Sequence, residues 1–374
     1  MVRTRRVVAG FALALVLVAA LLWAVGPASI GAELAGTDLP VFALGFLGIT
    51  AALACWSEAV RRLLASAGSP VGGSRYRRAY LAGEFLKQVV PMGQSAGPVL
   101  LSYTVSSATD ARRDHSLAAA TVFAFCNVTA SLVLAVVGLT VLIATRRGPT
   151  GPLLRSVLVV TAVVSLAIAI AAVLAVFRRS VLERGVYALT DTLRRTVGRL
   201  SVRVREALAR ERVTATLAAF ETTVVRVSRD RSVLLTVGGL SVAGWLCFLV
   251  PLYTSFRALG SPVPFTLVVF VVPVVTLLNV VPLPGGLGGF EAALAGVTAA
   301  LSTADLATAT AAVVLFRLTN YWFLVALGGL AAGSLSLGVA DVPDVSAIED
   351  HLPVDAATRP PDGERTDSGV DGRA

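Results

Sequence analysis

The chain has 374 residues, of which 56% are hydrophobic and 15% charged, a formal net charge of +9 and a mean hydropathy of +0.79. The chain has only two histidines, which argues against His-based catalysis and against zinc or haem sites. Its three cysteines lie inside apolar runs, which argues against a disulfide framework. The apolar residues come in blocks of membrane-spanning length, so the composition predicts an all-α polytopic membrane protein without a cofactor.

Six apolar runs are long enough to cross a bilayer, which takes about 20 residues. The length of the first run, together with the second run that follows it, argues against a cleaved signal peptide. We therefore expect six full transmembrane helices, at Val7–Gly26, Leu39–Cys55, Leu117–Ala144, Leu153–Phe177, Val233–Phe256 and Leu306–Leu335.

Two further hydrophobic regions, Ala79–Ser106 and Phe265–Leu301, are interrupted by prolines and glycines. Each is expected to form two half-length helices, which either re-enter the membrane from one side or cross it as a short pair. The interruptions are Pro91, Gly93, Gly97 and Pro98 in the first region, and Pro282, Pro284, Gly285, Gly286, Gly288 and Gly289 in the second.

The distribution of arginine predicts the orientation in the membrane. Arginines precede the first run and follow the second, whereas the loop Pro27–Asp38 between them has neither lysine nor arginine. The segment Arg178–Arg231 holds 13 arginines against six acidic residues and is also expected inside. Arg146, Arg147 and Arg155 fall outside, a mild violation of the rule. The N and C termini are both predicted to be cytoplasmic.

The predicted membrane domain covers residues 1–338 and is followed by a tail, residues 339–374, with many acidic, Pro, Gly, Ser and Thr residues. This composition predicts a disordered cytoplasmic tail. Within the domain, residues 178–232 carry apolar residues at steps of three and four and an arginine-rich polar face, as in an amphipathic helix pair. This loop is interpreted either as a helix pair on an anionic leaflet or as an ordinary helical hairpin with a solvated face, and not as a nucleic-acid-binding element.

Broken helices at membrane depth favour a binding site. An unpaired peptide group in hydrocarbon costs several kcal/mol, so such a break persists only where it is buried in protein or lines a wet cavity. Residues 88–92 (QVVPM) align with residues 279–283 (NVVPL), and Gly97 then falls opposite Gly288. On the predicted topology the two regions are inverted relative to each other, as in transporters that bind an anionic group at half-helix N termini.

Ionisable residues in apolar surroundings sharpen this prediction, because charge inside a membrane is costly. Glu291 follows the glycines, Arg317 lies near the middle of the last run, and pairing the two would relieve both. Glu84 and Lys87 stand at i, i+3 spacing before Pro91, and Lys87 is the only lysine in the chain. The alternative interpretation is an interfacial ion pair at Glu84–Lys87 and a helix-packing clamp at Glu291–Arg317. Weaker candidates are Glu58, Asn127, Arg257, Asn279 and Asn320.

Four segments of the chain resemble those of a known protein family. They are RYRRAYLAGEFLKQVVP in the first half, and GWLCFLVPLYTSFRALG, PLPGGLGGFEAAL and LFRLTNYWF in the second. The chain resembles the membrane region of lysylphosphatidylglycerol synthases and similar flippase-like proteins over roughly Val7–Gly338. The resemblance implies a prokaryotic cytoplasmic-membrane protein with re-entrant helices around a lipid-accommodating cavity. Two departures stand out: the chain ends in an acidic tail where bifunctional members have a synthase domain, and TVFAFCNVTAS lacks the Glu-Arg pair that many relatives carry there.

The leading prediction is a flippase-like protein, not an enzyme, that binds or translocates an anionic lipid of the phospholipid or polyprenyl-phosphate type. Without an ATP-binding motif, directional transport would need an ion gradient or a partner. The alternative is a non-transporting scaffold for a lipid- or glycan-modifying membrane enzyme; a lipid-modifying enzyme using Glu291 lacks partner groups. The predicted substrate-binding residues are Glu84, Lys87, Pro91, Gly93, Gly97, Pro282, Pro284, Gly285, Gly286, Gly288, Gly289, Glu291, Arg317 and Asn320.

Overall fold

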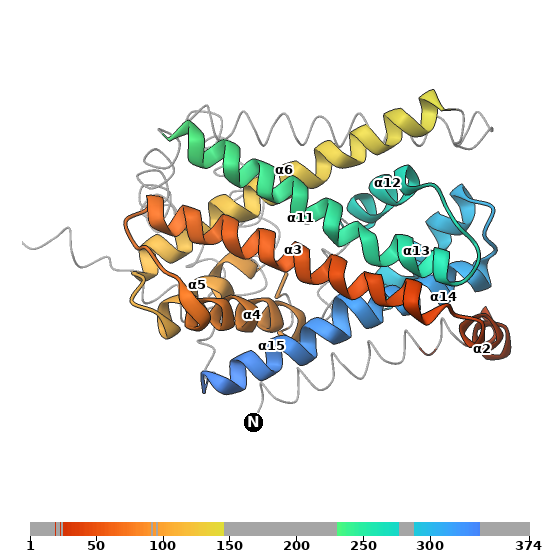
Figure 1. The fold of residues 1–374 in the computed structure, drawn as a ribbon, viewed down its shortest axis with the longest axis horizontal. Coiled ribbons are helices and arrows are strands. Elements are labelled where there is room, and N and C mark those ends of the chain that lie inside the picture. The colour runs from red at the N-terminus through yellow and green to blue at the C-terminus, as the bar shows by residue number, and fades with distance from the viewer. Residues whose placement is uncertain are drawn as a thin grey trace, which may run out of the picture.

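The computed structural model describes residues 25–90, 93–94, 96–145, 230–276 and 288–336, together with Ala19 and Trp23. Every regular element in these ranges is a helix, as predicted for the fold class (Figure 1). In chain order they are α2 (Pro27–Ala35), α3 (Leu39–Ser66), α4 (Gly73–Val89), α5 (Gly97–Ala108), α6 (Arg113–Ala144), α11 (Arg231–Ala258), α12 (Phe265–Thr276), α13 (Gly289–Leu301), α14 (Leu306–Arg317), the π-helical turn η3 (Leu318–Trp322) and α15 (Phe323–Ser334).

Four segments in the described ranges are long and apolar enough to cross a membrane: α3, α6, α11 and the continuous segment Leu306–Ser334. They coincide with four of the six predicted transmembrane helices, and the number of crossings stays a prediction. The predicted crossing at Leu153–Phe177, almost all of the one at Val7–Gly26, residues 178–229 of the basic loop and the tail at 339–374 lie outside the described residues.

The two interrupted regions each form a pair of short helices, as predicted. The first region contains α4 and α5, which pack against each other, and the second contains α12 and α13, which also touch. Helices α12 and α13 have 12 and 13 residues, too few to span a bilayer, which needs about 20. Whether either pair re-enters the membrane stays a prediction.

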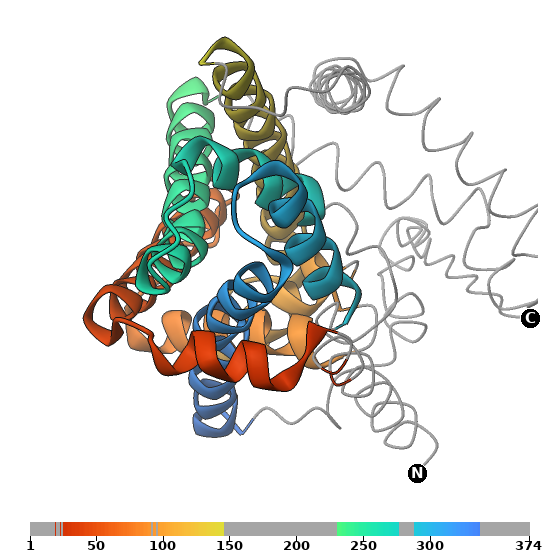
Figure 2. The same ribbon diagram turned by 90° about the vertical axis from the view of Figure 1, so that its right-hand side faces the viewer.

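Helices α3 and α11 form the most extensive packing interface of the described fold and run antiparallel. The backbone N–H of Asp38, just before α3, donates to the carbonyl of Ala258 at the end of α11 (2.8 Å). Glycines allow the close approach, because a Cβ at Gly48 would lie 2.8 Å from Val250 Cβ. In the turned view of Figure 2, the green α11 and the olive α6 lie side by side, in agreement with their packing contacts.

The short helices pack onto the long ones through further glycines. A Cβ at Gly138 in α6 would lie 2.8 Å from the backbone nitrogen of Phe270 in α12. A Cβ at Gly328 in α15 would lie 2.6 Å from the carbonyl oxygen of Leu81 in α4. Both short-helix pairs are thus held by backbone-to-backbone proximity, which fixes their position relative to the long helices.

The outward faces of the long helices carry large exposed apolar side chains. A soluble protein rarely exposes so many large apolar residues, whereas lipid contact requires them. This surface therefore agrees with the membrane assignment made from composition. The exposed residues include Leu44 and Leu47 on α3, Val133 and Val137 on α6, Leu235 and Leu246 on α11, and Leu330 on α15.

Helix α14, which carries Arg317 at its end, begins at a side-chain cap. The carboxylate of Asp305 accepts a hydrogen bond from the backbone N–H of Thr308 (2.7 Å), and this bond lowers the pKa of Asp305. Aspartate is among the residues preferred at this position because its oxygen satisfies an otherwise unpaired N–H.

Replacing Asp305 with alanine is expected to lower the free energy of unfolding by about 1 kcal/mol at neutral pH. Because the folded-state pKa lies below the unfolded one, the charge-dependent part of this stability is present above the unfolded pKa. It is lost as the pH falls through about 4. Unfolding midpoints of both proteins in detergent across this range test it, and a difference that does not change with pH would contradict it.

Candidate functional site

A buried ion pair joins the second broken region to the last long segment. Arg317 Nε donates to Glu291 Oε1 at 2.5 Å, and the two residues are only 8% and 4% exposed. Glu291 lies in the first turn of α13 and Arg317 at the last position of α14. The predicted Glu291–Arg317 pairing is therefore confirmed, whereas its role in binding is not decided by the pairing itself.

Glu291 also caps the helix on which it stands. Its second carboxylate oxygen, Oε2, accepts a hydrogen bond from the backbone N–H of Gly288 (2.5 Å). Gly288 has φ = 89°, in the left-handed region that favours glycine, and this conformation turns the chain into α13. A carboxylate is also favoured there by the positive end of the helix dipole. Glu291 thus ties the start of α13 to the end of α14.

Two aromatic rings lie close to the Arg317 guanidinium. Its Cζ atom is 4.9 Å from the ring centre of Phe290 and 4.8 Å from that of Tyr321. Both distances are within the range of cation–π attraction, which strengthens where water is excluded. Phe290 also stacks on Phe316, with 6.4 Å between ring centroids. The charge of Arg317 is therefore held in an apolar, aromatic setting.

A π-helical turn, Leu318–Trp322, follows Arg317 directly, a feature that the sequence did not predict. Such turns inside α-helices are frequent at functional sites. Asn320 and Tyr321 belong to it and are 7% and 1% exposed. In the described part of the chain, Asn320 Oδ1 and the Tyr321 hydroxyl are buried without a hydrogen-bond partner. Buried polar atoms in this state are rare in proteins.

The first broken region holds the second predicted pair. Lys87 Nζ donates to both carboxylate oxygens of Glu84, at 2.8 and 2.7 Å. The Glu84 side chain is 7% exposed and that of Lys87 is 19% exposed, so the pair is largely buried. It lies in the last two turns of α4, where a cation also complements the helix dipole.

Two glycines of the predicted site, Gly93 and Gly97, lie close to Lys87. A Cβ at Gly93 would clash with the carbonyl oxygens of Lys87 and Val90, so the chain can turn back on the end of α4 only with glycine there. Gly97 begins α5, and a Cβ on it would lie 3.4 Å from Lys87 Cδ. The stem of Lys87 therefore lies over the start of α5.

The structure brings the predicted site residues together in two groups. The first contains Glu84, Lys87, Gly93 and Gly97, and the second contains Gly288, Gly289, Glu291, Arg317 and Asn320. To the second group the structure adds Phe290 and Tyr321, which sequence reasoning missed; their aromatic rings in an apolar run gave no signal. Five predicted site residues lie outside the described residues: Pro91, Pro282, Pro284, Gly285 and Gly286.

The fold and the buried pairs define a polytopic α-helical membrane protein with two pairs of short helices and ion pairs inside its apolar body. Residues 7–328 match the family model for the lysylphosphatidylglycerol synthase TM region, and the chain belongs to this family. The resemblance seen in the sequence is thereby confirmed.

A curated relative extends the comparison. The chain is similar to a UPF0104 membrane protein of Methanothermobacter thermautotrophicus, with 28% identity over 124 residues. The aligned part is 31% of this chain and 35% of that protein, so the match spans about a third of the relative. No solved structure matches the chain.

Proposed function

We propose that the chain is a flippase-like protein that binds the anionic group of a membrane lipid, of the phospholipid or polyprenyl-phosphate type, and lets it cross the prokaryotic cell membrane. The observation that carries the proposal is the buried pair Glu291–Arg317, next to which the polar atoms of Asn320 and Tyr321 have no hydrogen-bond partner among the described residues. Charge and unsatisfied polar groups inside a membrane protein are costly and mark pathways for ions and substrates.

The two interactions of Glu291, with Arg317 and with the N–H of Gly288, suggest how an anion enters the site. A phosphate that approaches Arg317 competes with Glu291 for the guanidinium, which matches phosphate geometry well. Glu291 then keeps its second bond, to the N–H of Gly288, so α13 remains capped while Arg317 changes partner. The Tyr321 hydroxyl and Asn320 side chain lie in the turn after Arg317 and supply further polar contacts for the headgroup.

The first broken region supplies the second cation of the proposed path, Lys87. Its ammonium is a compact point charge that suits transient contact with a phosphate better than a rigid fork does. No ATP-binding motif occurs in the sequence. The chain by itself therefore equilibrates a lipid between leaflets, and directional movement needs an ion gradient or a partner.

Leaflet exchange in liposomes tests the proposal. Purified protein is reconstituted with a fluorescent anionic phospholipid, and the fraction of label open to a membrane-impermeant quencher is followed in time. We expect wild-type protein to accelerate exchange at least about tenfold over protein-free liposomes, a barrier change of about 1.4 kcal/mol. Arg317→Ala and Glu291→Gln should slow it strongly, since each removes a charge of the proposed site.

Arg112→Gln is the matched control, because the Arg112 side chain is 70% exposed and pairs with Asp114 before α6. Its exchange should equal that of the wild type. Unchanged exchange in both Arg317→Ala and Glu291→Gln would contradict the site. If wild-type protein gives no exchange, the alternative function as a scaffold for a membrane enzyme is favoured.

A further inference from the structure

A pocket between the end of α3 and the beginning of α11 is separate from both groups of predicted site residues. It has a volume of about 380 Å³, within the roughly 300–1,000 Å³ of typical ligand pockets. Two arginines and three hydroxyl side chains contribute to its wall. The lining residues are Arg61, Arg62, Ala65, Ser66, Asp230, Ser232, Val233 and Thr236.

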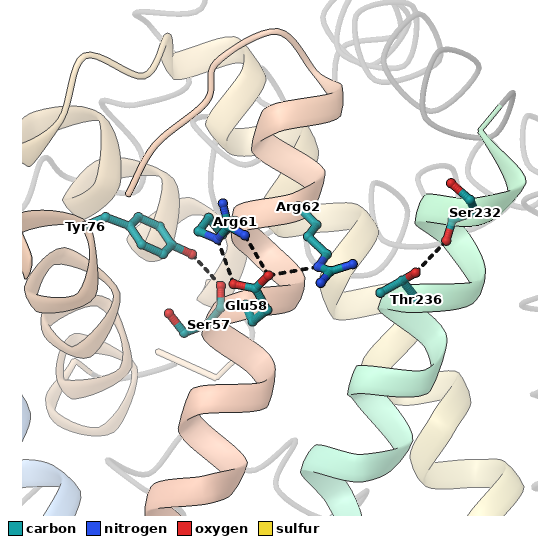
Figure 3. A network of polar contacts seen from close by, with 7 residues as sticks. All are labelled: Ser57, Glu58, Arg61, Arg62, Tyr76, Ser232 and Thr236. Carbon is teal, nitrogen blue, oxygen red and sulfur yellow. Dashed lines mark hydrogen bonds and ion pairs between the residues drawn. The ribbon is translucent and has the colours of Figure 1, made fainter. Parts of the chain in front are cut away.

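Glu58 fixes the two arginines from one side. Arg61 donates from Nε and Nη2 to its two carboxylate oxygens, both at 2.7 Å, and Arg62 donates from Nε at 2.9 Å (Figure 3). Since a guanidinium has five N–H donors, Arg62 keeps four and Arg61 three beyond these bonds within the described part of the chain. Two arginines held by one carboxylate carry a net charge of +1.

Arg62 is the donor that faces the gap between the helices. In Figure 3 its guanidinium extends from α3 toward α11, where Ser232 and Thr236 lie. The hydroxyls there are already engaged: Ser232 donates to Asp230 Oδ1 (2.7 Å) and Thr236 donates to the carbonyl of Ser232 (2.7 Å). Recognition of an anion in this pocket therefore rests on the guanidinium N–H groups.

Asp230 is the acidic residue of the pocket lining, and its side chain is engaged at the start of α11. Its Oδ1 accepts from the backbone N–H groups of Ser232 (3.0 Å) and Val233 (3.2 Å), and so it caps α11. The Ser232 hydroxyl bond lowers the pKa of Asp230, so the carboxylate is ionised at neutral pH. The positive end of the α11 dipole, about half an elementary charge, offsets part of this charge. Arg231, the first residue of α11, adds a further positive charge at the same helix start.

The pocket lies where the charged end of the helices meets their apolar part. Arg61, Arg62 and Arg231 stand at this level, and the apolar stretch of α11 starts at Val233. The arginine distribution assigns this end to the cytoplasm. Basic pockets between transmembrane helices on that side suit the headgroups of anionic lipids.

We infer that this pocket is a binding site for a phosphate group at the cytoplasmic membrane surface, held by Arg62 with Arg61. The phosphate comes from the headgroup of an anionic lipid or from a free phosphate ion. The site is separate from the Arg317 group and does not depend on the proposed transport function. Its occupant would offset the positive charge of the two arginines that Glu58 leaves unpaired, and it would lie against the beginning of α11.

Native mass spectrometry of the full chain in detergent tests this site. Short-chain phosphatidylglycerol and the matching diacylglycerol, which lacks phosphate, are titrated separately, and inorganic phosphate is added as competitor. We expect Arg62→Gln to weaken phosphatidylglycerol binding about tenfold, or about 1.4 kcal/mol. Arg231→Gln removes the same charge from the neighbouring surface outside the pocket lining and should change binding less than about twofold.

Ala65→Trp provides a second variant that keeps both arginines. Ala65 is an exposed pocket residue, so a tryptophan there fills the pocket with little effect on folding and should also abolish the Arg62-dependent binding. Displacement by inorganic phosphate would identify the free ion as a source, and resistance to it would identify the lipid. Equal binding of both lipids, equal effects of Arg62→Gln and Arg231→Gln, or unchanged binding in Ala65→Trp would overturn the inference.

Discussion

Replacing Arg317 with alanine is expected to lower the free energy of unfolding by about 3–5 kcal/mol, the usual cost of breaking a buried ion pair. The substitution leaves the carboxylate of Glu291, which is 4% exposed, without its cationic partner. It also removes the cation–π contacts of the guanidinium with Phe290 and Tyr321. Chemical unfolding in detergent, followed by tryptophan fluorescence, measures the loss.

The double variant Glu291→Leu/Arg317→Met is the matched comparison. Replacing both charges with apolar groups of similar size avoids an unpaired charge, so its loss should be much smaller than that of Arg317→Ala. A remaining loss is expected from the missing cap on the Gly288 N–H. An Arg317→Ala loss below about 1 kcal/mol would mean that the pair behaves as a solvated surface pair.

The second large effect is expected at Gly328, where α15 meets α4. A Cβ there would lie 2.6 Å from the Leu81 carbonyl oxygen and 2.7 Å from Phe85 Cβ. Gly328→Ala must push the helices apart, and we expect a destabilisation of about 1–3 kcal/mol from overpacking. Because α4 carries Glu84 and Lys87, the same shift would displace the first broken region.

Gly329→Ala is the control for this prediction. A Cβ at Gly329 would lie 3.6 Å from Phe85 Cε2, an ordinary contact. Alanine is favoured over glycine inside a helix by about 1 kcal/mol, so this variant should be neutral or stabilised. Thermal unfolding of both variants gives the comparison, and equal effects at the two neighbouring positions would contradict the packing argument.

The sequence predicted the helical fold class and the pairing of Glu291 with Arg317 because of the membrane setting. Charge inside an apolar run is so costly that the two residues had to meet. The paired short helices were predictable for a similar reason, since clusters of prolines and glycines end helices, whereas the single prolines Pro251 and Pro273 lie inside α11 and α12. Both predictions rest on large free-energy costs that can be read from the sequence: the cost of an unpaired charge inside the membrane, and the cost of continuing a helix through a cluster of prolines and glycines.

The π-helical turn after Arg317 could not be predicted in this way. Residues 318–322, Leu-Thr-Asn-Tyr-Trp, contain neither proline nor glycine, so their composition does not mark the turn. Gly97 and Gly288 show the same limit. They align in sequence, but Gly288 has a left-handed conformation, whereas Gly97 does not and lies against the stem of Lys87.

Arg61 and Arg62 help to indicate the orientation of the chain in the membrane, and they also line a pocket. In the sequence these arginines served only to orient the chain, because arginine is enriched in all cytoplasmic loops. Their shared hydrogen bonds to Glu58 and their position against α11 depend on the antiparallel packing of α3 and α11. A single sequence gives no register for that packing.

Leaflet exchange by the Glu291→Leu/Arg317→Met variant tests the central claim most directly, since the claim is that the charges at this buried pair serve an anionic lipid. The variant is first shown to be folded by its unfolding transition and then reconstituted with the fluorescent anionic phospholipid. The account predicts that this folded variant loses the exchange shown by the wild type. Exchange at the wild-type rate in the charge-free variant would contradict it and leave Glu291 and Arg317 as a packing clamp.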